Sequence, residues 1–235
     1  MKTIVITGVS SGLGKSFFSR LSQSDSQLIG ISRTFSNEQI ELAKARPDRI
    51  CLLETDLATS WQVLDTKPLE LALARFACDE LVFISNAGTI QPISPVGMAA
   101  AEAIRDSMAV NMLGPMMFAR VLTDHARRLN GRLTILNISS GAATRAIAGW
   151  SSYCSAKAGI HMFFDVLAAE SAGASQVRIT QIDPGALDTG MQKAIRSAER
   201  SDMPARDDFI RLKKEGKLRD PEDVASEIVS KYLGQ

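Results

Sequence analysis

Tyr153 and Lys157 are the residues whose types and spacing are best suited to proton transfer. They stand four positions apart in Ser-Tyr-Cys-Ser-Ala-Lys, and Ser140 precedes the tyrosine by thirteen residues. In a helix this spacing places the ammonium group and the phenol on one face, where a cation is expected to lower the phenol's ordinary pKa of about 10. The serine hydroxyl can hold a carbonyl oxygen beside them. Alone, the Tyr-x-x-x-Lys spacing also fits an amphipathic helix with a half-buried tyrosine and a solvent-reaching lysine.

A glycine-rich turn near the start of the chain is the second chemical feature. Residues 4–6 are apolar and predict a strand, and residues 15–21 have the periodicity of a helix. The glycine spacing between them, Gly-x-x-x-Gly-x-Gly, lets the backbone approach a phosphate and directs the free N–H groups of the helix start toward it. A glycine turn without a ligand is the alternative. The residues of this motif are Gly8, Ser10, Ser11, Gly12, Leu13 and Gly14.

The elements that position these residues alternate between strand and helix. Apolar runs rich in β-branched residues predict six strands, at residues 2–7, 27–32, 49–54, 80–85, 132–139 and 177–183. Each run is followed by a stretch with helical periodicity, which predicts an α/β fold of the Rossmann type, a doubly wound parallel sheet flanked by helices. We expect one domain over residues 1–235. The polar segment 188–220 is predicted to be irregular, either a substrate lid or a surface insertion.

Composition narrows the range of functions. The 27 basic and 26 acidic residues leave a formal net charge of +1, which gives no electrostatic reason to expect nucleic acid or an anionic membrane as a partner. Cys51, Cys78 and Cys154 are irregularly spaced, and with only two histidines they indicate neither a disulfide framework nor a metal site. With no signal-peptide features and no long apolar run, we expect a cytoplasmic protein that acts on a small molecule.

Further motifs occur at fixed distances from these two. In chain order the set is Thr7-Gly8-x-x-x-Gly12-x-Gly14, Asn86-Ala87-Gly88, Asn111, Ser140, Tyr153-x-x-x-Lys157 and Pro184-Gly185-x-x-x-Thr189. Residues 1–190 thereby resemble the short-chain dehydrogenases/reductases. Within that family, the chain is most similar to bacterial benzil reductases, and next to sepiapterin reductases, at residues 139–142, 149–150, 153–154 and 212–218. The resemblance implies a catalytic tetrad of Asn111, Ser140, Tyr153 and Lys157.

The resemblance also implies a nicotinamide cofactor. NAD-preferring folds place an Asp or Glu at the end of the second strand to bind the ribose hydroxyls. This chain has Ser32-Arg33-Thr34 there, and a guanidinium pairs well with a 2′-phosphate, so we expect NADP(H); the alternative for Arg33 is a solvated turn. The family pattern implies further cofactor contacts at Asp56, Leu57, Asn86, Ala87, Gly88, Pro184, Gly185, Leu187 and Thr189.

Tetrad and cofactor together imply an NADPH-dependent carbonyl reductase. A hydride reaches the carbonyl carbon while Tyr153 donates a proton to the oxygen, Ser140 orients that oxygen, and Lys157 lowers the pKa of the tyrosine. In the family that the chain resembles, this lysine also touches the nicotinamide ribose. Asn111 lies just before a Gly-Pro pair, which is expected to bend the helix and free a backbone carbonyl for a water leading to Lys157.

The expected substrate pocket is largely apolar, which suits a bulky, uncharged aromatic ketone or 1,2-diketone. A pteridine or steroid-type reductase is the first alternative, and a non-catalytic NADP-binding sensor is the second. The expected rim of the pocket comprises Ala142, Ala143, Arg145, Ile147, Trp150, Met191, Gln192 and Ile195.

The helix that carries Tyr153 is apolar over more of its surface than packing on one sheet face requires. In family members this helix and the preceding long one, here residues 101–129, pair with a second subunit across a two-fold axis. Members of the family usually also end in a seventh strand, whereas here the predicted helix 221–233 is followed only by Gly234 and Gln235. We therefore expect a homodimer that does not depend on that strand.

Overall fold

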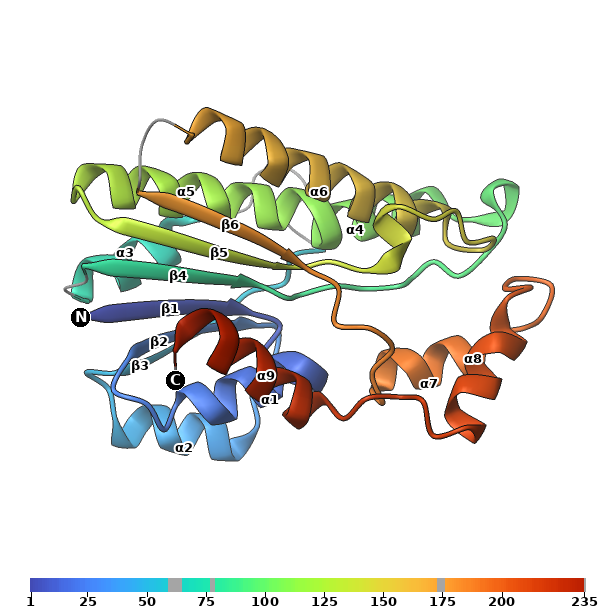
Figure 1. The fold of residues 1–235 in the computed structure, drawn as a ribbon, viewed down its shortest axis with the longest axis horizontal. Coiled ribbons are helices and arrows are strands. Elements are labelled where there is room, and N and C mark those ends of the chain that lie inside the picture. The colour runs from blue at the N-terminus through green and yellow to red at the C-terminus, as the bar shows by residue number, and fades with distance from the viewer. Residues whose placement is uncertain (59–64, 77–78, 173–175, 235) are drawn as a thin grey trace.

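The strands form one parallel sheet in the order β3-β2-β1-β4-β5-β6 (Figure 1). The computed structural model of the chain describes residues 1–58, 65–76, 79–172 and 176–234. The six predicted strands are confirmed, and three of them are one residue shorter than expected. The strands are β1 (Lys2–Thr7), β2 (Gln27–Ser32), β3 (Ile50–Glu54), β4 (Glu80–Ser85), β5 (Arg132–Ile138) and β6 (Val177–Ile182).

Helices cover both faces of this sheet, which explains why its central strands are apolar almost throughout. Val5 and Phe83 pack toward α3, α5 and α6, whereas Ile4 and Val82 pack toward α1 and α9. Adjacent residues of a strand therefore belong to two different cores. The helices of these layers are α1 (Gly12–Leu21), α2 (Asn37–Ala45), α3 (Lys67–Arg75), α4 (Ala101–Met108), α5 (Gly114–Arg128), α6 (Ser151–Glu170) and α9 (Pro221–Leu233).

The expected long helix at residues 101–129 is interrupted where the sequence indicated a bend. Between α4 and α5 lies one π-helical stretch, η2 (Ala109–Leu113), and the N–H of Gly114 donates to the carbonyl of Ala109 five residues earlier. Such π-bulges occur frequently at functional sites. This one contains Asn111.

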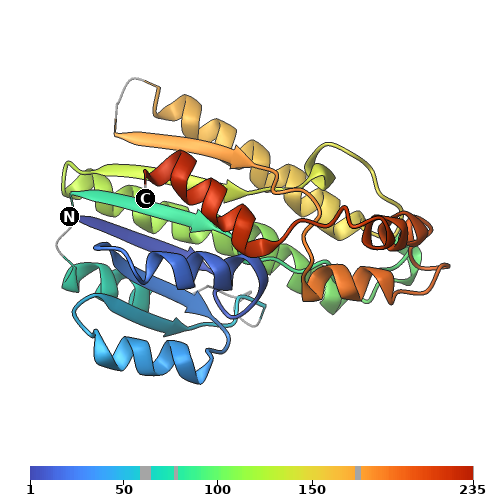
Figure 2. The same cartoon turned by 60° about the horizontal axis from the view of Figure 1, so that its bottom comes forward.

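Segment 188–220 is not irregular as predicted, because it contains α7 (Gly190–Arg196) and α8 (Arg206–Lys214). Both helices lie beyond the carboxyl ends of the strands, away from the layered body of the molecule (Figures 1 and 2). Two short helices of seven and nine residues with few buried side chains have weak sequence periodicity, which explains the error. The short 3-10 turns are η1 (Val96–Met98) and η3 (Gly141–Ala143).

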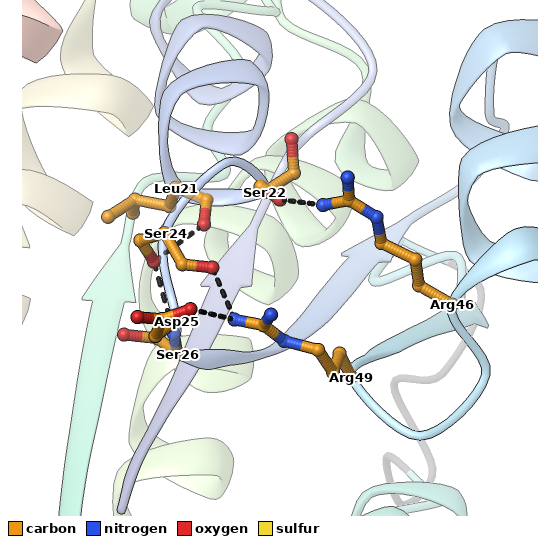
Figure 3. A network of polar contacts seen from close by, with 7 residues as sticks. All are labelled: Leu21, Ser22, Ser24, Asp25, Ser26, Arg46 and Arg49. Carbon is orange, nitrogen blue, oxygen red and sulfur yellow. Dashed lines mark hydrogen bonds and ion pairs between the residues drawn. The ribbon is translucent and has the colours of Figure 1, made fainter.

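Arginine side chains join the two connections that lead into β2 and β3, at the amino ends of these strands (Figure 3). Arg46 donates to the carbonyl of Ser22 at 2.9 Å, and Arg49 donates to the carbonyl of Ser24 and approaches the carboxylate of Asp25 at 3.4 Å. These contacts tie the α1–β2 connection to the α2–β3 connection. This network lies far from the carboxyl ends of the strands.

The chain ends beside its first helix. Ser16 of α1 donates to Glu222 of α9 at 3.2 Å, and Lys2 donates to the carbonyl of Leu233 at 3.2 Å. In the described part of the chain the sheet has six strands, with β6 at one edge. None of the helices described is long and apolar enough to cross a membrane. Cys78 lies outside the described residues.

Candidate active site

One cavity of about 1080 Å³ opens at the carboxyl ends of the strands. It runs from the glycine turn of β1 to the two helices of segment 188–220. All but one of the residues that the sequence indicated for catalysis and cofactor binding line it; the exception is Asn111. Additional lining residues are Thr55, Thr89, Ile90, Gln91, Asp106, Val110, Asp183, Ala205, Asp208, Phe209 and Leu212.

The glycine turn is tightly packed against the loop that follows β4. A Cβ on Gly14 would lie 2.0 Å from the carbonyl oxygen of Gly8 and 2.4 Å from Nδ2 of Asn86, so a side chain there cannot be accommodated. Asn86 in turn donates to the carbonyl of Thr7 at 3.0 Å, and the Thr7 hydroxyl accepts from the N–H of Ala87. The turn is thus fixed with its backbone facing the cavity.

The start of α1 has the properties of a phosphate site. Ser11, the residue before the helix, makes no side-chain hydrogen bond to it, and no acidic residue occupies its first turn. The first N–H groups of a helix lack intrahelical partners and carry partial positive charge, so they favour an anion. The methyl group of Thr189 stands 3.2 Å from a Cβ placed on Gly12, which brings the segment after β6 to the same turn. These residues therefore fit a dinucleotide pyrophosphate.

Arg33 lies at the end of the cavity where the sequence predicts the adenosine of the cofactor. It follows β2 directly, its side chain is exposed, and among the described residues no carboxylate pairs with it. The neighbouring Ser32, Asp56 and Leu57 also line the cavity, and Asp56 accepts from the N–H of Ala58 at 2.9 Å. A guanidinium without a protein counterion at this position suits a phosphate on the adenosine ribose.

The first turns of α6 bring Tyr153 and Lys157 beneath the middle of the cavity. Each side chain is 6% exposed, and the ammonium group lies 5.8 Å from the centre of the tyrosine ring. Nζ of Lys157 donates to the carbonyl of Ile138 at 2.9 Å, at the end of β5. Ser140, two residues farther along, also lines the cavity and accepts from the N–H of Ala142 at 3.2 Å.

Burial changes the proton affinities of both buried groups. Desolvation raises the pKa of Tyr153 to about 12, a hydrogen bond with Ser140 opposes the change, and the charge of Asp183 adds to it. Desolvation also lowers the pKa of Lys157 to about 8, against the opposing effect of Asp183. The sequence led us to expect a lowered pKa for Tyr153, whereas burial raises it here. The phenol is protonated at neutral pH, which is the form that a proton donor needs.

Asn111 does not line the cavity but lies under it, 1% exposed. Its side chain accepts from the N–H of Thr89 at 2.9 Å and donates to the carbonyls of Thr89 at 2.8 Å and Ser107 at 3.0 Å. It therefore joins the π-helical stretch to the loop after β4.

At the end of the cavity where the sequence predicts the substrate, aromatic and apolar side chains surround the tyrosine. The ring of Trp150 packs edge-on against that of Tyr153 at 5.4 Å, and Phe209 of α8 lies 5.4 Å from Trp150 on another side. Of the expected rim, every residue lines the cavity except Ala143. Successive residues of the 3-10 turn point in different directions, so Ala142 faces the cavity as expected and Ala143 does not.

Two contributors were not singled out from the sequence. Asp183 places a negative charge near the buried pair, and Phe209 covers Trp150. Phe209 could have been noticed as the only aromatic residue of segment 188–220. Asp183 gave no recognisable signal, because its role depends on contacts between distant elements. Thr7, which the sequence placed in the glycine motif, also uses its hydroxyl to hold the loop after β4.

Comparison with known proteins adds relatives of stated activity. The family described as short chain dehydrogenase matches residues 2–200. A benzil reductase ((S)-benzoin forming) of Bacillus cereus is 33% identical over 97% of this chain and 92% of its own length. A sepiapterin reductase of Xenopus tropicalis is 32% identical over 92% of this chain and 85% of its own. The crystal structure of the KRED1-Pglu enzyme superposes with a TM-score of 0.82 and 28% identity, covering 99% of this chain and 95% of that one.

Proposed function

The chain belongs to the short-chain dehydrogenase family, and from that premise we propose that it is an NADPH-dependent carbonyl reductase for bulky aromatic ketones and 1,2-diketones. The observation that supports this most is the convergence of Ser140, Tyr153 and Lys157 at the junction between the glycine-turn end of the cavity and its aromatic end. A reacting carbonyl can lie there within reach of a proton donor and a hydride donor together.

The cofactor of this proposal is NADP(H). The glycine turn and the start of α1 would hold the pyrophosphate, Arg33 the 2′-phosphate, and the loop from Pro184 to Thr189 the nicotinamide end. When bound, NADPH supplies the hydride. Asp56, Leu57 and the Asn86–Gly88 loop would complete the adenosine and ribose contacts.

Around the reacting carbonyl, the side chains act on the oxygen. Ser140 donates a hydrogen bond that orients it, and Tyr153 transfers its hydroxyl proton to the oxygen as negative charge develops there. Lys157, when protonated, stabilises the tyrosinate that remains, and its bond to the carbonyl of Ile138 fixes its position. Asn111 is a positioning residue, because its side chain holds the loop after β4 from below.

The aromatic end of the cavity supports the substrate class. Its lining is aromatic and apolar and comprises Trp150, Phe209, Ile90, Ile147 and Ile195. The aromatic rings of a substrate gain binding energy by packing against such side chains. We propose that segment 188–220, with α7 and α8, is the substrate lid. A β-bridge between Leu187 and Arg219 joins the two ends of this segment. The N–H of Arg219 donates to the carbonyl of Ala186, and the carbonyl of Arg219 accepts from the N–H of Asp188.

The test is a substrate panel assayed with NADPH and with NADH by the absorbance of the reduced nicotinamide. We expect benzil to be reduced fastest, an aromatic monoketone more slowly, and NADPH to be preferred. Turnover confined to sepiapterin would favour a pteridine reductase. Tight NADPH binding with no turnover of any member would favour the non-catalytic sensor.

A further inference from the structure

Arg145 is a cation at the substrate end of the cavity whose role the mechanism above leaves open. In the part of the chain that the structure describes, three basic residues line the cavity: Arg33, Arg145 and Lys157. Arg33 lies at the adenosine end, and Lys157 is buried beneath Tyr153. Arg145 follows Ser140 by five residues, in the loop between β5 and α6 that also supplies the aromatic Trp150.

The guanidinium of Arg145 lies against the backbone next to the catalytic serine. A Cβ placed on Gly141 would stand 2.0 Å from Nη2, 3.0 Å from Cζ and 3.2 Å from Nε of Arg145. Nε also donates to the carbonyl of Gly141 at 3.4 Å. The backbone of Arg145 is close to the start of α6, because Sγ of Cys154 lies 3.6 Å from its carbonyl oxygen. The exposed guanidinium is therefore held beside Gly141, the residue that follows Ser140, and lines the cavity there.

Among the described residues, no carboxylate neutralises this charge. Asp208 lines the cavity, but it pairs with Arg211 at 2.7 Å, and Gln192 accepts from Arg196 at 3.0 Å. A guanidinium carries five N–H donors in a planar fork, and the contact with Gly141 uses only the one on Nε. The Nη donors are the part of Arg145 suited to a substrate oxygen.

We propose that Arg145 selects substrates with a second oxygen on the carbon next to the reacting carbonyl, that is, 1,2-dicarbonyl compounds. This inference rests on the proposed function. The reacting oxygen is held by Ser140 and Tyr153, and the neighbouring oxygen accepts from the guanidinium of Arg145. Without that donor the second oxygen would be desolvated against apolar walls with no partner, which is unfavourable. A monoketone gains nothing from this contact.

The experiment compares benzil with deoxybenzoin, which keeps both phenyl rings but lacks the second oxygen. The measured quantity is the ratio of kcat/KM for the two substrates, in the wild type and in Arg145→Met. Methionine preserves much of the apolar stem and removes the donors. A hydrogen bond to a charged group predicts that the ratio falls about tenfold to a hundredfold in the variant.

Three further variants give independent support or contradiction. Gly141→Ala keeps the arginine but places a methyl group where its guanidinium lies, so the ratio should also fall. Arg145→Lys keeps the charge without the planar fork and should restore the ratio in part. Arg20→Met removes an exposed arginine of α1 that does not line the cavity and should leave the ratio unchanged. Benzoylformate distinguishes 2-oxo acids from 1,2-diketones within this class. If Arg145→Met lowers kcat/KM more for benzoylformate than for benzil, the site is assigned to 2-oxo acids. If it lowers kcat/KM less, the site is assigned to diketones.

The outcomes separate this inference from the function on which it rests. An unchanged ratio in Arg145→Met, with active enzyme, rejects the role of Arg145 and leaves the reductase intact. Absence of turnover by the wild type with both ketones rejects the proposed function and the role of Arg145 together.

Discussion

At the scale of the residue, burial decides the protonation states in the candidate site. The pKa of Tyr153 near 12 keeps the phenol protonated, and the pKa of Lys157 near 8 leaves the amine charged over most of the neutral range. The fall from the ordinary value of 10.5 to about 8 corresponds to roughly 3 kcal/mol by which burial disfavours the charged lysine. The charged form of Lys157, which the mechanism needs, is therefore expected to reduce the stability of the cofactor-free protein.

This lysine gives a prediction for stability against pH. Its folded pKa lies below its unfolded value, so between pH 8 and 10 the unfolded chain binds more protons and stability rises with pH. Relative to Lys157→Met, the cofactor-free wild type should gain about 2 kcal/mol of unfolding free energy over this interval. Urea unfolding at both pH values measures it. Parallel pH dependence of the two proteins would contradict the burial of an ionisable amine.

The exposed arginine at the adenosine end predicts cofactor preference. Arg33→Ala should raise the Kd of NADPH about tenfold to a hundredfold, because a charge-assisted pair with the 2′-phosphate is lost, and should change the Kd of NADH far less. Fluorescence titration of both cofactors measures this, with Arg20→Ala as a control that should affect neither. Equal weakening of NADPH and NADH would mean that Arg33 does not contact the phosphate.

At the scale of the element, the substrate end depends on α8 resting on the loop before α6. Phe209 reaches Trp150, although no residue of α8 is fully buried. The helix is therefore expected to contribute to substrate binding much more than to the stability of the fold.

Phe209→Ala tests this division. The lost ring contact should raise KM for benzil about two- to tenfold, while the melting temperature changes little. Ile210→Ala, an apolar truncation on the same helix at a residue that does not line the cavity, is the matched control. A large fall in melting temperature without a change in KM would make α8 a part of the core instead.

The elements also show what the sequence can and cannot predict. The strands follow from apolar runs, and their parallel arrangement follows from the helical stretches between them. The carboxyl ends of β1, β4, β5 and β6 bring the motif residues to the same end of the sheet. The pKa of Tyr153 and the contact of Phe209 with Trp150 were not predictable in this way, because each depends on desolvation or on packing between segments far apart in the chain. Likewise, only the structure shows that Arg145 lies over Gly141.

At the scale of the whole molecule, one helical face remains apolar at the surface. Four apolar residues of this face are between 36% and 62% exposed: Ile104 of α4, Leu113 of η2, and Met162 and Val166 of α6. This face does not involve β6, the edge where a seventh strand would pair. Covering it with the same face of a second copy would remove these side chains from water.

We therefore predict a homodimer through this helical face. Light scattering at micromolar concentration should give about twice the 25.4 kDa mass of the monomer. Val166→Asp should shift the mass toward the monomer, whereas Leu71→Asp, which alters an exposed leucine on α3, should not. A wild-type mass near 25.4 kDa would show that the apolar face does not mediate stable association.

Proton donation by Tyr153 in an NADPH-dependent carbonyl reduction is tested by comparing Tyr153→Phe with Tyr232→Phe. The chain has only these two tyrosines, and Tyr232 lies on α9 away from the cavity. With benzil and NADPH, Tyr153→Phe should lower kcat by about a hundredfold or more while the Kd of NADPH changes little, and Tyr232→Phe should retain activity. Near-normal turnover by Tyr153→Phe would contradict the account.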